Sequence, residues 1–87
     1  MLESYPATEA QKQVLRSPPK NNRCLLPREL ENLKNYTDVI VYLWLKAGRG
    51  YWYHILYAKD NVLTGYLLIN GRWRYRPVPI RKISKYF

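Results

Sequence analysis

The chain is poor in the residues that build several kinds of site. It has one Cys and one His among 87 residues, which excludes an intramolecular disulfide and a zinc site made of several Cys and His ligands. Its longest apolar run, Val39 to Leu45, is far shorter than the ~20 residues of a membrane helix. The first residues lack the basic and apolar regions of a secretory signal. We therefore expect a cytoplasmic protein with no metal, no cofactor and no membrane partner.

Acidic residues are also scarce, and none follows Asp60. Six Asp and Glu stand against fifteen Lys and Arg, for a formal net charge of +9. A chain this basic attracts anions, and nucleic acid is the most abundant polyanion inside a cell. Nucleic acid is thus the expected partner, with acidic protein surfaces as the alternative. Composition does not distinguish DNA from RNA, and it leaves the oligomeric state open.

The chain is long enough for one domain but not for two. Thirteen residues are aromatic, and twelve of them lie from Tyr36 onward. Rings in this number supply the apolar surface that a disordered chain lacks. The sequence accordingly predicts a flexible N-terminal arm over residues 1–26 and a small β-rich domain over 27–87. Within the arm, Thr8 is a candidate N-cap for a short helix that Pro18 and Pro19 would stop.

From Asp38 onward, side chains alternate with the period of two that is typical of strands. Asn70-Gly71 predicts a two-residue type I′ hairpin, because both residues tolerate positive φ. Gly65 predicts a bulge or bend within a strand. Residues 78–87 fit either a short helical turn or a fifth strand. The expected elements are a helix over about 27–35 and strands over about 38–46, 51–58, 62–69 and 72–76.

Short strands joined by tight turns indicate a mainly β fold with one short helix. A small antiparallel SH3-like barrel is the first expectation, because closure removes exposed sheet edges. A curved sheet of four or five strands with the helix across one face is the second. Pro77 and Pro79 limit further pairing, so the strand over 72–76 should end early or lie at an edge.

The segment Arg72-Trp73-Arg74-Tyr75-Arg76 is the most suggestive motif in the sequence. Alternate residues of a strand share a face, so the three arginines form a row at intervals of roughly 6.6–7 Å. Guanidinium groups bind phosphate oxygens in pairs. We expect this row to contact the phosphate backbone of a nucleic acid, with Trp73 pointing the other way into the core.

Other cations and rings extend this expected site. Basic clusters add sequence-independent affinity by releasing counterions, and exposed aromatic rings can stack on bases. Trp52 and Tyr75 are the rings proposed for stacking. The added cations are Arg81, Lys82 and Lys85 near the C-terminus, and Lys46 and Arg49 in the first hairpin turn.

The sequence shows no catalytic constellation. His54 lacks a local partner, and there is neither a nucleophile motif nor a carboxylate pair, so a structural histidine is expected. The leading interpretation is a non-catalytic module that binds nucleic acid through its phosphate backbone with low sequence specificity. The alternatives are a small subunit that docks an acidic protein and, third, a metal-independent ribonuclease toxin.

Overall fold

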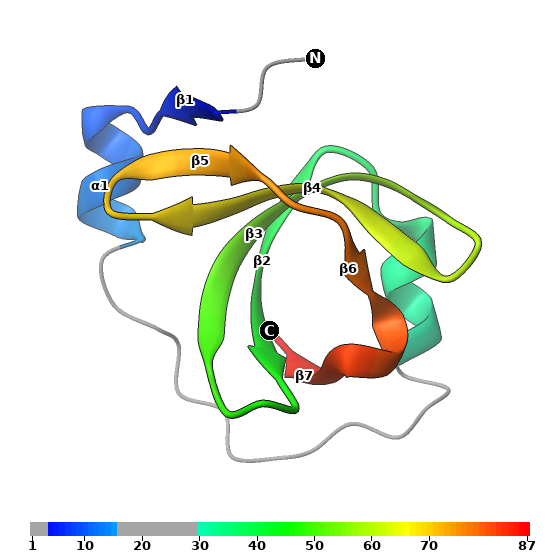
Figure 1. The fold of residues 1–87 in the computed structure, drawn as a ribbon. Helices are drawn as coiled ribbons and strands as arrows, with labels where there is room; N and C mark the ends of the chain where they lie inside the picture. The colour runs from blue at the N-terminus through cyan, green and yellow to red at the C-terminus, as the bar shows by residue number, and fades with distance from the viewer. Residues whose placement is uncertain (1–3, 16–29) are drawn as a thin grey trace.

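The computed structural model describes residues 4–15 and 30–87, which are organised around one antiparallel sheet (Figure 1). Two of the helices in these ranges, labelled η, are short 3₁₀ helices. The strands are β1 (Ser4–Pro6), β2 (Val39–Leu45), β3 (Gly50–Lys59), β4 (Val62–Ile69), β5 (Arg72–Tyr75), β6 (Val78–Pro79) and β7 (Ile83–Tyr86), and the helices are α1 (Glu9–Val14), η1 (Glu31–Asn35) and η2 (Ile80–Lys82).

The sheet curls strongly but does not close. Its strands follow the order β1-β5-β4-β3-β2-β7, and β6 pairs with β4 away from this path. The mainly β antiparallel architecture is confirmed. A closed SH3-like barrel is not, because the end strands β1 and β7 each pair with one neighbour only.

The four predicted strands agree with the structure to within one or two residues. The β4 strand covers 62–69 as expected, and β5 ends at Tyr75, just before the prolines. It does not lie at the sheet edge, however, because β1 pairs along its other side. Residues 78–87 contain both of the alternatives, a 3₁₀ turn between two short strands. Of the predicted helix, residues 27–29 lie outside the described ranges, and η1 occupies 31–35.

Two local features occur where glycine signals predict them. Asn70 and Gly71 have φ values of 51° and 76°, as the predicted type I′ turn requires. Opposite Gly65, the pairing of β3 with β4 shifts register between Ile55 and Tyr57. A Cβ on Gly65 would lie 2.0 Å from the carbonyl oxygen of His54, so only glycine fits here. This irregularity lies in the middle of the sheet and accompanies its curl.

Alternation along the strands gives the sheet two faces of different composition. We call the concave side, which holds Leu43 and Ile55, the inner face; it packs against η1, β6, η2 and β7. We call the opposite side, which holds Trp73 and Tyr66, the outer face. The buried inner cluster is Leu33, Val41, Leu43, Tyr53, Ile55, Leu63, Leu67, Val78, Ile80 and Ile83.

The outer face is covered by residues 4–15, a segment that we call the strap. The sequence assigns these residues to a flexible arm, whereas in the structure β1 pairs with β5 and Ala7 is buried beside Trp73. The physical reason is the apolar outer face, which the strap removes from water. Thr8 is the N-cap of α1, as predicted. The rest of the expected arm, residues 1–3 and 16–26, lies outside the described residues.

Candidate nucleic-acid interface

The three arginines of the predicted motif are exposed, and we call them the arginine row. Arg72 and Arg74 lie on β5, and Arg76 comes directly after it. On β4, Ile69 lies opposite Arg72 and Leu67 lies opposite Arg74. Because paired residues share a face, both arginines extend the inner face beyond its apolar part. Trp73 is fully buried in the outer cluster, as expected. The structure therefore separates the cations of this strand from its core ring.

The backbone at the end of the row is held at two points. The Arg76 amide donates a hydrogen bond to the Gly65 carbonyl at 2.9 Å. The hydroxyl of Tyr53, a fully buried ring, lies 2.6 Å from the Arg76 carbonyl and 3.1 Å from that of Leu63. Burial raises the pKa of Tyr53 far above its ordinary value, with a smaller contribution from Tyr75. A neutral, buried tyrosine thus fixes the start of the Arg76 side chain.

Carboxylates do not neutralise the row among the residues that the structure places. The ion pairs found within residues 4–15 and 30–87 join Glu9 to Lys12, Glu31 to Lys34 and Asp38 to His54, and none of them includes an arginine of the row. Arg72 makes one polar side-chain contact in these ranges, from Nη2 to the hydroxyl of Ser4 at 3.3 Å. Within these ranges, the positive charge of β5 is therefore not paired with a carboxylate.

A groove of about 290 Å³, which we call the basic groove, opens on the inner face beside the row. Among the described residues, its lining contains two cations, Arg76 and Lys82, one ring, Tyr51, and no acidic side chain. Its remaining lining is apolar and contains Leu67 and Ile69, the β4 partners of the first two arginines. The groove and the arginine row thus form one continuous surface: Leu45, Tyr51, Leu67, Ile69, Arg72, Arg74, Arg76, Pro77, Val78, Pro79 and Lys82.

The other predicted cations gather around the opposite end of the sheet. The Lys46 amide donates to the Lys82 carbonyl at 2.8 Å, which joins the first hairpin turn to η2. Lys85 lies over the Trp44 ring, with its Nζ 4.9 Å from the ring centroid. Along the sheet order, β7 is the far end from β5. Of the C-terminal cations, Lys82 alone lines the basic groove and adjoins the arginine row, while Arg49 and Arg81 are exposed and Lys85 lies on Trp44.

The two rings predicted to stack on bases lie on the outer face. Tyr75 is 38% exposed and packs edge-on against Tyr66, with ring centroids 5.8 Å apart. Trp52 is half-buried against Tyr42 at 5.0 Å, and its indole N–H has no partner. Tyr51, which is not one of the two predicted rings, is the ring that borders the basic groove. Strand alternation alone predicts that Tyr51 and Trp52 lie on opposite faces of the sheet. The face that carries the arginines becomes known only from the pairing of β4 with β5.

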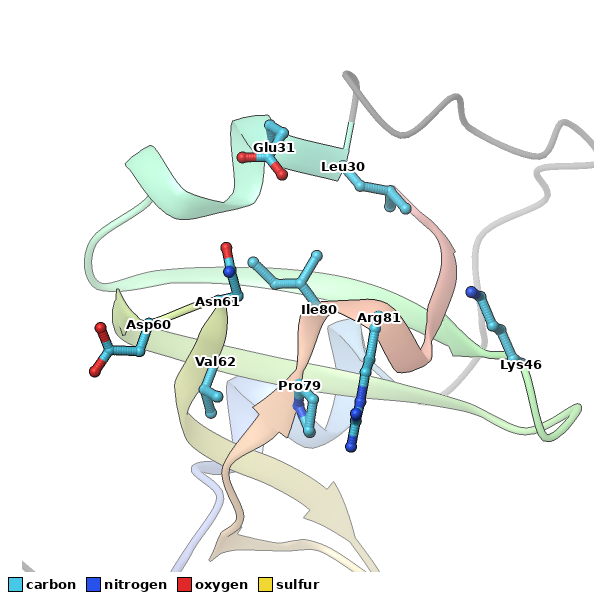
Figure 2. A pocket seen from close by; sticks show the side chains of 9 residues that line it. All are labelled: Leu30, Glu31, Lys46, Asp60, Asn61, Val62, Pro79, Ile80 and Arg81. Carbon is cyan, nitrogen blue, oxygen red and sulfur yellow. The ribbon is translucent and has the colours of Figure 1, made fainter.

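A second pocket, of about 590 Å³, lies between η1 and the β6–η2 segment (Figure 2). Figure 2 shows Lys46 and Asp60 at opposite ends, with Ile80 and Leu30 between them. Two cations and two carboxylates line it, so its charge does not select an anion. Its lining is Leu30, Glu31, Lys46, Asp60, Asn61, Val62, Pro79, Ile80 and Arg81.

His54, without a local partner in the sequence, has two partners in the structure. Its Nε2 donates to the Asp38 carboxylate at 2.5 Å, and its Nδ1 lies 3.1 Å from the Tyr5 hydroxyl. Burial raises the pKa of Tyr5, with smaller contributions from Tyr66 and Asp38. A chain from carboxylate to imidazole to phenol resembles a catalytic relay. Here it lies on the face opposite Arg72 and Arg74, and it ties the strap to the start of β2.

Comparison of the chain with protein families, with curated proteins and with solved structures found no match. Across residues 4–15 and 30–87, no three His, Cys, Asp or Glu side chains come together as a metal site would require. Within the same ranges, no helix is long and apolar enough to cross a membrane.

Proposed function

We propose that this protein is a non-catalytic module that binds the phosphate backbone of nucleic acids through the arginine row. The observation that supports the proposal is the exposed row, which pairs with no carboxylate within residues 4–15 and 30–87 and opens onto a groove to which Lys82 adds one further cation and these ranges add no acid. Bidentate guanidinium–phosphate contacts suit such a row. An interior cellular location, where nucleic acid is abundant, belongs to the same proposal.

The proposed specificity for sequence is low. Phosphate contacts position a protein but carry no information about bases. The longest helix in the described ranges, α1, has six residues and lies against the outer face, so it is not arranged as a recognition helix for the major groove. Binding is accordingly electrostatic and falls steeply with salt.

The test compares two triple variants with equal net charge. One replaces Arg72, Arg74 and Arg76 by Ala; the control replaces the exposed or half-buried Lys12, Lys34 and Lys59 by Ala, none of which lies on β5 or lines the basic groove. Binding of a fluorescent oligonucleotide is measured between about 50 and 300 mM salt. We expect the arginine variant to lose about 100-fold in affinity at low salt, and its log–log salt slope to flatten by about 2, because each lost phosphate contact removes roughly 0.7–0.9.

The control variant should change affinity only severalfold, because it lowers the long-range field but removes no contact. Equal losses in the two variants would mean that total charge, and not the row, attracts the ligand. Absence of binding by the wild-type protein at the lowest salt would contradict the function itself and favour an acidic protein partner.

A further inference from the structure

The basic groove is too small for a length of nucleic acid but has the lining of a site for one base. Its volume of about 290 Å³ lies at the lower end of the ~300–1,000 Å³ range of small-molecule sites. Its floor is apolar, and a single aromatic side chain, Tyr51, borders it. Apolar walls with one ring accept a flat aromatic group.

The two cations of the groove come from two different segments of the chain. Arg76 follows β5, and Lys82 ends η2. Because the backbone of Arg76 is held by Gly65 and Tyr53, its side chain starts from a fixed point. A base inside the groove would have its two neighbouring phosphates near these cations, and the strand would continue past Arg74 and Arg72, which flank the same floor residues.

We infer that the basic groove binds one unpaired base of a single-stranded nucleic acid, stacked on Tyr51, with flanking phosphates on Arg76 and Lys82. This inference rests on the proposed function and adds the class of ligand. In a duplex, a base would have to leave its stack to enter the groove, which costs free energy. The protein therefore prefers single strands over duplexes of the same sequence.

The first experiment measures the affinity of a single strand and of its duplex for three variants. Stacking on an aromatic side chain stabilises a bound base by an amount that corresponds to about tenfold in affinity. We expect Tyr51→Leu to lose about tenfold for the single strand and nothing for the duplex, while Tyr51→Phe retains the wild-type preference. Tyr57→Leu is the control, because Tyr57 is 46% exposed and lies outside the groove. An equal loss for both ligands, or no loss for the single strand, would overturn the inference.

A second measurement does not depend on how well the Tyr51 variants fold. The wild-type protein is irradiated with a single strand that carries iodouracil, and the crosslinked residue is identified by mass spectrometry. Crosslinking to Tyr51 supports the inference. Crosslinking confined to Trp52 or Tyr75 overturns it, because those rings lie on the outer face.

The two proposals fail in different ways. Equal affinity of the wild-type protein for single strand and duplex, with the expected loss in the arginine variant, would overturn the base site and leave the phosphate contacts standing. No binding of either ligand at low salt would overturn both.

Discussion

The two faces of the sheet are made by the same strands, yet they are covered by different parts of the chain. Aliphatic side chains dominate the inner face, which η1, β6, η2 and β7 close, and these elements neighbour the sheet strands in the sequence. The outer face is rich in rings and is closed by the strap from the other end of the chain. The inner face is therefore completed largely within residues 30–87, whereas the outer face is complete only when a distant segment docks.

Function follows the same division. The arginine row and the basic groove open on the inner face, whereas the His54 link and the strap occupy the outer face. Substitutions on the outer face should therefore lower the stability of the protein, and substitutions in the arginine row should lower its affinity for the ligand, independently of each other. Three substitutions use this separation, in order of decreasing effect on stability.

The largest effect is expected from Trp73→Ala, which tests whether the outer face is a true core. Trp73 is fully buried, and its indole N–H donates to the Gln11 side chain at 3.2 Å. Removing such a ring lowers the free energy of unfolding by about 3–5 kcal/mol. Chemical denaturation measures the loss, and Trp44→Ala, at a half-buried ring, is the control. A loss below about 1 kcal/mol would show that the inner face alone carries the stability.

An intermediate effect is expected from Tyr53→Phe, which probes the polar anchor of the inner face. The variant loses the hydroxyl contacts to Arg76 and Leu63, at a cost of about 1–2 kcal/mol at neutral pH. Burial raises the pKa of Tyr53, so the unfolded state loses its proton first when the pH rises past its ordinary pKa of about 10. The contribution of the Tyr53 hydroxyl to the free energy of unfolding is hence fully present below about pH 10 and is lost progressively as the pH rises above it.

Melting curves between pH 7 and about 11 check the sign of this linkage. The decline above pH 10 should be shallower in Tyr53→Phe than in the wild-type protein. The decline that remains in the Tyr53→Phe variant is attributed to Tyr5 and Tyr42, whose pKa values are also raised by burial. The exposed Tyr57→Phe should leave the curve unchanged, and an identical decline in all three proteins would rule out Tyr53 as its source.

The smallest effect is expected from Thr8→Ala, which loosens the strap alone. Thr8 and Gln11 form a reciprocal capping box at the start of α1, with hydrogen bonds of 3.0 and 3.1 Å. Loss of an N-cap costs about 1 kcal/mol. Hydrogen exchange should quicken at the Lys12 and Leu15 amides and remain unchanged in β2, β3 and β4. Thr64→Ala, within β4, should show the reverse pattern.

Local patterns in the sequence predict the strands and turns well, because alternation and the Asn-Gly turn act between near neighbours. The bend at Gly65, the burial of Trp73 and the Thr8 cap follow from the same short-range signals. The position of the strap does not, since it depends on β1 meeting β5. Nor does local sequence show that His54 has partners, because Tyr5 lies 49 residues away.

The candidate site also has one part that local sequence predicts and another that depends on contacts between distant segments. The arginine row is visible in the sequence because its residues alternate within one strand. Tyr51 and Lys82 join it only through the curl of the sheet, which brings η2 to the face where Arg76 lies. Tyr75 and Trp52 were natural candidates by composition, but register assigns them to the other face.

The pairing of β1 with β5 has a consequence for the order of folding events. Gln11 and Trp73 are 62 residues apart in a sequence of 87 residues, so their contact closes a loop that spans most of the chain. Hairpins such as β4–β5 form within microseconds, whereas contacts between distant residues slow the search for the native state. If the hairpins assemble first and this assembly limits the folding rate, the strap docks last, on a surface that is already formed. Substitutions in the strap should then alter the unfolding rate far more than the folding rate of the remaining sheet.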